Sequence, residues 1–253
     1  MNIDNRISLF VVALIYFIII SIALSNFVEM VLRFFEDVRH VATATEKERL
    51  LPLFEKVYAE ASLKGKLISS NVKLYIVDDI PINAFALGRN TIAVTRGLIE
   101  NMDDDEIEGI LAHEFGHMAY GDPQISTLIA LGTTFYLWIL LFFKGIFRLF
   151  EVATKFDTHN TSSLSYIFMA ITALIDLGIK IIMFIWLAIV AGGGRKKEYR
   201  ADSFAKELGY GEALLSALYK LYDLQISDKR KLVDRIKKEH PRTAYRIEAL
   251  ENS

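Results

Sequence analysis

The sequence predicts a mainly α-helical protein with a small β-sheet, in which a membrane-helix hairpin interrupts one folded domain. The 253 residues are 53% hydrophobic, with a mean hydropathy of +0.30, which is high for a soluble protein. Three apolar segments reach the length of about 20 residues that crosses a bilayer. Between the first two of these segments, short β-type runs alternate with charged helical patterns, as expected for a small folded domain.

The three apolar segments cover residues 7–26, residues 125–143 and part of residues 164–191. The first also resembles a secretory signal, because Ala23-Leu24-Ser25 could be a cleavage site. An uncleaved anchor is favoured, since the apolar run is long for a signal and continues into more helix. We therefore expect four parts, namely an anchor helix with its extension (1–42), the first part of a folded domain (43–123), a transmembrane hairpin (124–191) and the second part of that domain (192–253).

Charge and cysteine content exclude several classes of protein. The net charge of −2 and the pI near 6.2 give no basic surplus for a phosphate backbone, so we expect no nucleic-acid partner. The chain has no cysteine, which excludes disulfides and thiolate metal ligands. A basic cluster follows the third apolar segment and consists of Arg195, Lys196, Lys197 and Arg200. The positive-inside rule places this cluster, and with it the bulk of the polar chain, in the cytoplasm.

The folded part before the hairpin should begin with a charged helix over residues 45–63, which Pro52 bends or restarts. Strands are expected at residues 73–77 and 91–94, with a third at residues 83–85, because turn signals separate these runs. The acidic cluster at residues 103–106 suits the first turn of a helix, which should stop near residues 120–123.

After the hairpin, we expect Gly192–Gly194 to loosen the chain before three helices, at residues 196–208, 212–224 and 243–251. Within the third apolar segment, Asp176 and Lys180 are spaced to form an ion pair, since ionisable groups are costly in a membrane. His40 and His159 are interpreted as surface residues.

The motif His113-Glu114-Phe115-Gly116-His117 points to chemistry. On a helix, its two histidines lie one turn apart on one face, which suits a zinc ion. Two protein ligands leave coordination positions open, and the glutamate between them can deprotonate a water that the metal has acidified. The pattern is that of a zinc-dependent hydrolase.

A third ligand is needed, and Glu198 is the best candidate. In Glu198-Tyr199-Arg200-Ala201-Asp202 a helix places Glu198 and Asp202 one turn apart, so Glu198 can reach the metal while Asp202 contacts a ligand imidazole or the substrate. The alternative is an ordinary polar helix that starts just outside the membrane.

Together these elements resemble the HtpX membrane metalloproteases, relatives of the CAAX prenyl proteases. The resemblance runs from about residue 71 to the carboxyl end and rests on four ordered elements: residues 113–117, residues 198–202, Asn83-Ala84-Phe85-Ala86 before Gly88-Arg89-Asn90, and His240-Pro241-x-Thr243-x-x-Arg246-Ile247. That family also carries a membrane hairpin between the motif and the third ligand. One departure is that HtpX proteins usually have two spans before the catalytic domain, whereas this chain shows one.

The resemblance implies a zincin-type fold in which one zinc ion is bound by His113, His117 and Glu198, with Glu114 as the catalytic base. It also implies substrates that are membrane proteins or unfolded polypeptides, often damaged ones, at the cytoplasmic face of a prokaryotic membrane. The sequence leaves the oligomeric state open, and the lipid bilayer is an expected partner.

Other residues are candidates for substrate handling. His240 and Arg246 can donate to the developing oxyanion, although a helix cap and a surface salt bridge are their alternatives. Asp202 can instead pass a proton to the leaving group. The segment Asn83-Ala84-Phe85-Ala86 can pair with an extended peptide as an added strand, or can be an interior strand of the sheet.

Two rival functions stay open at this point. A prenyl-protein protease needs a large membrane chamber, which three spans are too few to enclose. A non-catalytic zinc-containing membrane adaptor is disfavoured by the intact Glu114, because a structural zinc site gains nothing from a base beside open metal positions.

Overall fold

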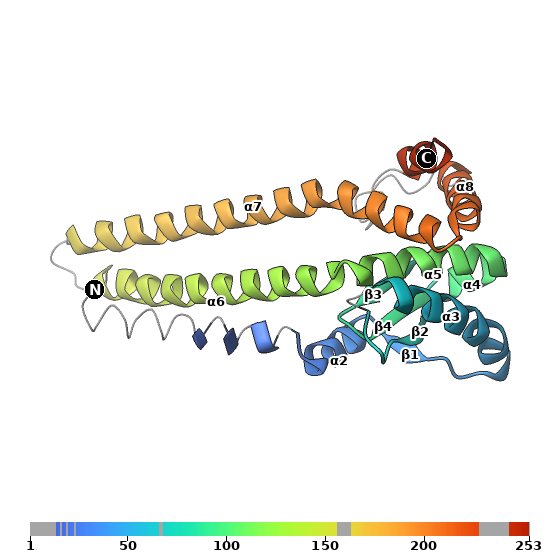
Figure 1. The fold of residues 1–253 in the computed structure, drawn as a ribbon. Coiled ribbons are helices and arrows are strands. Elements are labelled where there is room, and N and C mark those ends of the chain that lie inside the picture. Colours follow the sequence, from blue (N-terminus) through green and yellow to red (C-terminus); the bar gives the residue numbers. More distant parts are fainter. Residues whose placement is uncertain are drawn as a thin grey trace, which may run out of the picture. The chain divides into compact units, whose positions relative to one another are not determined.

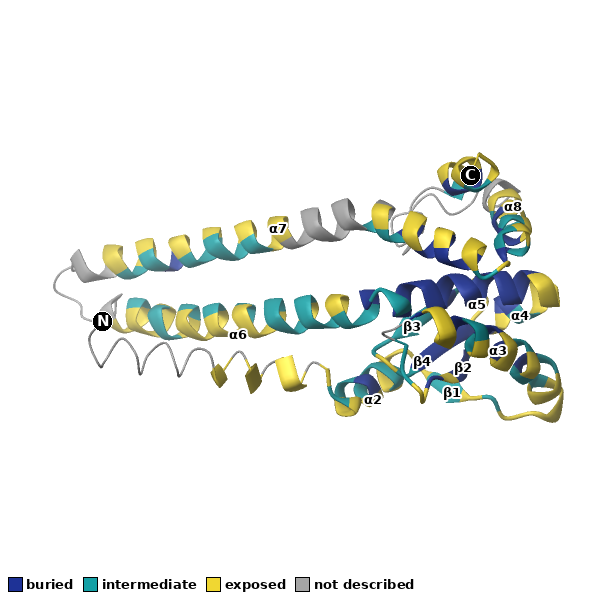
Figure 2. Cartoon of the chain, in the orientation of Figure 1, coloured by how far each residue is buried: buried dark blue, intermediate teal, exposed yellow. Residues whose placement is uncertain are grey.

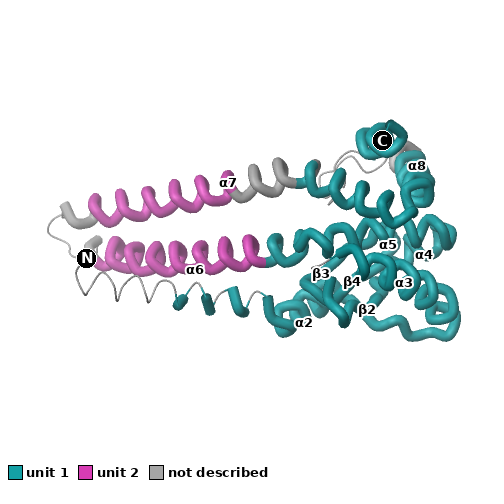
Figure 3. The backbone as a smooth tube through the Cα atoms, in the orientation of Figure 1, with its two compact units in different colours: residues 1–127, 194–253 teal, residues 128–193 magenta. Residues whose placement is uncertain are grey.

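The computed structural model describes residues 14–15, 17–18, 20–22, 24–65, 68–155, 163–227 and 243–252 (Figure 1). The chain divides into two units (Figure 3). Unit 1 comprises residues 1–127 and 194–253, and unit 2 comprises residues 128–193. The prediction of a mainly helical protein with a small sheet is confirmed.

Unit 1 contains a four-stranded sheet in the order β1-β2-β4-β3. Strand β2 (Lys73–Val77) pairs in parallel with β4 (Thr91–Thr95), while β1 (Val38–His40) and β3 (Ala84–Leu87) are antiparallel to their neighbours. The strands predicted at residues 73–77 and 91–94 are confirmed, and the third begins one residue later than predicted. Strand β1 has three residues and was not predicted. Strand β3 therefore lies at one edge of the sheet.

Most helices of unit 1 follow their predicted bounds, whereas the short helix at residues 96–101 was not predicted. The helices are α2 (Asn26–Phe35), α3 (Ala44–Lys64), α4 (Arg96–Asn101), α5 (Asp104–Ala119), α8 (Gly211–Ser227) and α9 (Thr243–Glu251). Helix α3 is uninterrupted at Pro52, so this proline does not restart the helix. Helix α5 begins with a capping box, in which Asp103 accepts from the backbone N–H of Glu106 and Glu106 accepts from that of Asp103.

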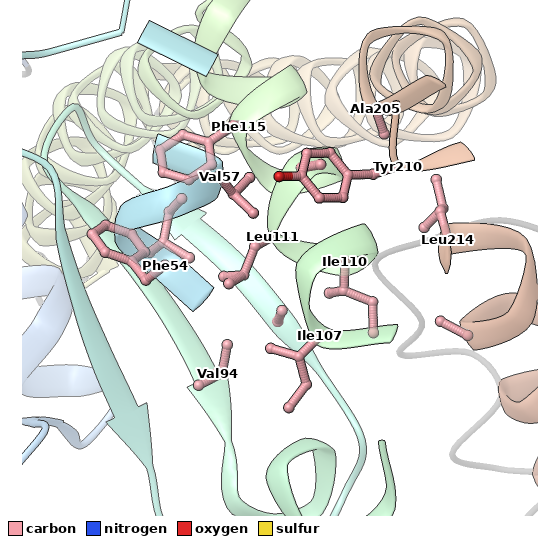
Figure 4. Close-up of a cluster of buried hydrophobic side chains, with 14 of the residues drawn as sticks. Phe54, Val57, Val94, Ile107, Ile110, Leu111, Phe115, Ala205, Tyr210 and Leu214 are labelled. Atoms are coloured by element: carbon pink, nitrogen blue, oxygen red, sulfur yellow. The ribbon is translucent and has the colours of Figure 1, made fainter. Parts of the chain in front are cut away.

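The core of unit 1 forms around α5, which packs against α3, α8 and β3. Phe115 of α5 stacks with Tyr58 of α3 at 5.6 Å between ring centroids, and Phe54 lies beside both. Figure 4 shows the core side chains of three helices, namely Phe54 of α3, Ile107, Leu111 and Phe115 of α5, and Leu214 of α8. Because α5 is buried on nearly all sides, its polar residues also lie inside the protein, where each needs a partner.

Unit 2 consists of the central parts of two long helices, α6 (Asp122–Lys155) and α7 (Ser163–Glu207). Both contain stretches long and apolar enough to cross a membrane, at residues 122–153 and 166–185. Asp176 of α7 pairs with Lys144 of α6, and not with Lys180 as the sequence suggested. An ionic contact between helices satisfies both charges where water is scarce.

Helix α7 is continuous through Gly192–Gly194. The prediction that these glycines loosen the chain is therefore wrong. In a helix each backbone N–H and C=O is bonded within the segment, and glycine lowers helix stability by only about 1 kcal/mol per residue relative to alanine. The apolar part of α7 before these glycines and its polar part after them keep the segment helical despite this cost.

Candidate metal centre

Helix α5 places both histidines of the predicted motif on one face. His113 and His117 are four residues apart and buried, and Glu114 between them is buried as well. The imidazole centroids lie 4.7 Å apart with the rings nearly perpendicular. Their Nε2 atoms are 3.2 Å from each other. The spacing of four residues thus delivers two nitrogen donors to one point.

The carboxyl-terminal part of α7 supplies the facing group. Glu198 is buried, with its Oε2 atom 3.5 Å from Nε2 of His113 and its Oε1 atom 3.4 Å from Nε2 of His117. The two helices approach closely at Gly116, where an added Cβ would lie 2.8 Å from Cα of Ala201. Glycine at this position of the motif is therefore what lets α7 bring Glu198 within reach of both imidazoles.

Each imidazole is also held by a second carboxylate at its other nitrogen. Nδ1 of His113 lies 2.8 Å from Oδ1 of Asp202, and Nδ1 of His117 lies 3.0 Å from Oδ2 of Asp122. An ionised carboxylate only accepts hydrogen bonds, so each Nδ1 carries a proton, and each Nε2 is the nitrogen that remains to bind a metal ion. This arrangement orients both rings toward Glu198.

Arg246 of α9 lies behind the site and is buried. Its guanidinium donates to both oxygens of Asp202, at 2.6 and 2.9 Å, and its Nη1 atom is 3.2 Å from Oε2 of Glu198. A planar guanidinium suits such a two-point contact. Arg246 therefore ties together the two carboxylates that α7 contributes.

The electrostatics of the site favour a bound cation. Burial lowers the pKa of His117, but its hydrogen bonds to Asp122 and Glu198 outweigh burial and raise that pKa to about 10. Burial raises the pKa of Asp202, but His113 and Arg246 outweigh it, and the carboxyl pKa falls below its ordinary value. Acidic groups outnumber the basic side chains that face them by one, since the site holds Glu114, Glu198, Asp122 and Asp202 against Arg246, Arg200 and Lys197.

The donor set fits a divalent metal ion. Among the described residues His113, His117 and Glu198 form the one group of three whose ligand atoms are close enough to share an ion. Tetrahedral coordination with bonds of about 2.0 to 2.1 Å separates the donors by about 3.3 to 3.4 Å. The observed separations of 3.2, 3.4 and 3.5 Å match this value. Imidazole and carboxylate are donors that zinc accepts.

The structure brings together most of the residues that the sequence singled out. His113, Glu114, His117, Glu198, Asp202 and Arg246 gather in one cluster. The segment Asn83-Ala84-Phe85-Ala86 lies largely in β3, which packs against α5. His240 lies outside the described residues.

Asp122 is the one contact of the cluster that sequence reasoning missed. It was read only as part of the signal that ends α5, yet its carboxylate binds His117 and also accepts from Arg200 at 2.9 Å. The sequence did contain a signal for this contact, because the carboxylate of Asp122 follows His117 by one tight turn and can reach back to its imidazole. A metal-binding imidazole needs such a partner.

A histidine pair on one helix, a glutamate on a second and a small mixed sheet beside them define a zincin-type fold with a candidate metal site. The chain belongs to peptidase family M48, whose model matches residues 44–253. With two apolar helices of membrane-spanning length among its described residues, it is a membrane protein of that family.

Among curated relatives, protease HtpX of Pseudomonas syringae pv. tomato is 36% identical over 144 residues, which are 55% of this chain and 46% of that protein. Protease HtpX of Erwinia tasmaniensis is 29% identical over 209 residues, which are 76% of this chain and 70% of that protein. The first match thus spans about half the length of the relative. The crystal structure of S. mikatae Ste24p aligns with a TM-score of 0.52 at 20% identity, over 97% of this chain and 57% of that one, and shows the shared fold.

Proposed function

We propose that this protein is a membrane-embedded zinc endopeptidase that hydrolyses membrane proteins or unfolded polypeptides at the cytoplasmic face. One observation carries the proposal. Two buried imidazole Nε2 atoms and the Glu198 carboxylate converge within 3.5 Å, and Glu114 lies on the same helix turn as the histidines. A structural zinc site would use four protein ligands, whereas this cluster offers three and leaves one position for water or substrate.

The metal is one zinc ion per chain, held by His113, His117 and Glu198. When bound, zinc supplies the Lewis acid that activates water and polarises a peptide carbonyl. Glu114 accepts the proton from the attacking water and passes it to the leaving amine, since a carboxylate next to the ligand histidines is within reach of both.

The remaining residues of the cluster position these groups. Asp202 and Asp122 fix the tautomer and ring orientation of the two histidines. Arg246 holds Asp202 and Glu198, because its guanidinium nitrogens already contact their carboxylates. We assign His240 as the donor of a hydrogen bond to the developing oxyanion. In the carboxyl-terminal element it is the candidate that the sequence offers for this role besides Arg246.

The substrate pairs with the outer edge of β3 as an added strand. Thr95 donates its backbone N–H to the carbonyl of Asn83 at 3.0 Å, and the pairs along an antiparallel ladder alternate between bonded and unbonded. The backbone N–H and C=O groups of Ala84 and Ala86 therefore face away from β4. Small side chains at both positions leave room for a peptide backbone.

The proposed arrangement has four parts, and the charge pattern sets their orientation in the membrane. Residues 1–42 form an anchor helix and its extension, residues 124–191 form the transmembrane hairpin, and residues 43–123 and 192–253 together form the catalytic domain. Basic residues just after the third span favour a cytoplasmic catalytic domain in a prokaryotic cytoplasmic membrane.

The test is the Glu114→Gln variant of the full chain, purified in detergent and assayed for bound zinc and casein cleavage. We expect the variant to keep its zinc and to lose activity by about 10² to 10⁴-fold, because glutamine cannot take the proton. Asp105→Asn is the matched control, since Asp105 is exposed in the first turn of the same helix. Both should be compared with unmodified protein.

A different outcome would reject the proposal. If unmodified protein carries zinc and cleaves neither casein nor other unfolded substrates, the chain is a zinc-containing adaptor. If cleavage survives in a chelator that has removed all metal, the metal centre is not the catalytic site.

A further inference from the structure

Helix α2 is amphipathic in the opposite sense to a helix of a soluble protein. Its large apolar side chains point outward, with Phe27 64%, Phe34 81% and Phe35 77% exposed, whereas the carboxylate residue Glu29 is only 4% exposed (Figure 2). Phe27, Met30 and Phe34 are spaced by three and four residues and so share one face. A soluble helix buries its apolar stripe and solvates its charges.

The inward face of α2 is bound to the sheet by polar contacts. Oε1 of Glu29 accepts from the Thr91 hydroxyl at 2.6 Å and from Arg33 at 3.2 Å. Oε2 accepts from the backbone N–H of Arg89 at 3.0 Å and from the Asn90 amide at 3.3 Å. A buried carboxylate with four donors is fully satisfied, so this attachment fixes the orientation of the helix.

The attachment is tight as well as polar. Gly88, between β3 and β4, has a φ of +56°, and an added Cβ there would lie 2.6 Å from Oε2 of Glu29. The carboxylate thus occupies the space that a side chain at position 88 would need. Helix α2 cannot rotate its phenylalanines inward without breaking these contacts.

The chain before α2 indicates what covers the outward face. The described residues between 14 and 22 are helical and, apart from Ser21, apolar, and Leu14, Phe17, Ile18 and Ile22 are exposed. Ser25 is in an extended conformation and caps α2 by accepting from the N–H of Val28, so α2 is a new helix with its own direction. An apolar anchor that ends there brings α2 to the surface of the bilayer.

We propose that α2 is an interfacial helix that lies in the plane of the bilayer surface, with Phe27, Met30, Phe34 and Phe35 among the lipid headgroups and upper acyl chains. A helix with an apolar face of this kind immerses it by about 5 to 10 Å. The basic residue of α2 is Arg33, whose guanidinium is bound to Glu29 and Thr91, so insertion depends on apolar burial and not on anionic lipid.

The placement has a consequence for the substrate strand, which rests on the proposed function. Glu29 binds the turn that joins β3 to β4, so the depth of α2 sets the height of β3 above the membrane. An extended segment that emerges from the bilayer meets this edge strand within a few residues. The interfacial helix therefore selects peptide bonds close to the membrane surface.

The test uses the natural absence of cysteine, which allows a single label without removing others. Phe27→Cys, Phe34→Cys and Leu63→Cys are prepared in the full chain, labelled with a nitroxide and reconstituted in phosphatidylcholine vesicles. Leu63 is the control, because it is an apolar residue of α3 that is 89% exposed. Collision with oxygen, which concentrates in lipid, is compared with collision with a water-soluble nickel chelate.

We expect oxygen to be favoured at positions 27 and 34 and the nickel chelate to be favoured at position 63. Two results would overturn the proposal. Equal accessibility at positions 34 and 63 would mean that α2 faces water. Low accessibility to both reagents, with spin–spin broadening that disappears on dilution with unlabelled protein, would mean that a second copy covers the face.

This measurement does not depend on peptide cleavage, so its failure is distinct from failure of the proposed function. Cleavage supplies a second readout. In the double variant Phe27→Ser, Phe34→Ser, cleavage of a membrane-anchored substrate should fall about tenfold or more, while cleavage of soluble casein should stay within about twofold, because the catalytic cluster is untouched. An equal loss of cleavage for both substrates would contradict the inference that the depth of α2 in the bilayer positions the substrate strand.

Discussion

Asp122, the first residue of α6, holds Nδ1 of His117 through its Oδ2 atom at 3.0 Å. The same carboxylate accepts from Arg200 of α7 at 2.9 Å. One short contact therefore connects a metal-binding imidazole to the start of a helix that enters the apolar hairpin.

Removing this contact should weaken metal binding without unfolding the protein. We expect Asp122→Asn to lower zinc affinity by about 10 to 100-fold, because an amide no longer fixes the tautomer of His117 or raises its basicity. Competition with a chromophoric chelator measures the change, with Asp105→Asn as the control. Unchanged affinity in Asp122→Asn would assign this residue to the helix terminus alone.

Metal binding should compete with protons. Without metal, the acidic surroundings raise the pKa of His117 to about 10, so this imidazole is protonated through the neutral range and must release a proton when it binds zinc. Affinity should therefore rise with pH by up to about tenfold per unit for each proton displaced. Chelator competition between about pH 6 and 9, corrected for the chelator's own protonation, tests this. A flat profile would contradict it, and the slope should be shallower in Asp122→Asn.

The close approach of α5 and α7 predicts a steric effect inside the metal motif. Gly116→Ala places a Cβ 2.8 Å from Cα of Ala201, and backbone cannot move aside as a side chain can. We expect a loss of about 1 to 3 kcal/mol in stability and weaker zinc binding, because Glu198 is pushed away from the histidines. Gly132→Ala is the control, since no atom lies within 4 Å of its added Cβ. Equal thermal stability and zinc content in the two variants would contradict this account.

A pH-dependent stabilisation should arise at the start of α3, far from the metal. Arg39 of β1 contacts Glu46 at 2.7 Å and Asp78 at 2.5 Å, and its hydrogen bond lowers the pKa of Glu46 from 4.5 to about 2. A carboxyl whose pKa is lower in the folded state stabilises the fold above its unfolded pKa. This contribution should be complete above pH 4.5 and should disappear as the pH falls toward 2.

The variant Glu46→Gln isolates that contribution, because glutamine can keep the capping box with Thr43 while losing the charge. Thermal unfolding at neutral pH should show a lower melting temperature for Glu46→Gln than for the parent, and the difference should vanish in acid. Glu48→Gln, at an exposed position of the same helix, is the control. If the difference in melting temperature between Glu46→Gln and the parent persists at pH 2, the effect comes from packing and not from the charge of Glu46.

Local signals were enough to predict the central elements of the site. The acidic first turn and the histidine spacing located α5, and the four-residue spacing of Glu198 and Asp202 located the facing end of α7. Turn signals on either side of short β-type runs located β2 and β4. In each case the pattern follows from the geometry of one element, which a single sequence records directly.

Features that depend on contacts between distant residues were beyond such reasoning. Strand β1 has three residues with an arginine at its centre, and it exists because β2 pairs with it. The partner of Asp176 is Lys144, which is distant in sequence, whereas pattern reasoning considered only a neighbour one turn away. The role of Asp122 likewise depends on how the chain turns after α5.

The order of the candidate ligands along the chain determines when the metal site can assemble during synthesis. Translation produces both histidines first, then α6 and the apolar part of α7, and only afterwards Glu198 in the last turns of α7. A nascent chain therefore lacks one of the three candidate ligands until its hairpin has been synthesised, so the proposed metal centre can form only after both apolar segments have left the ribosome.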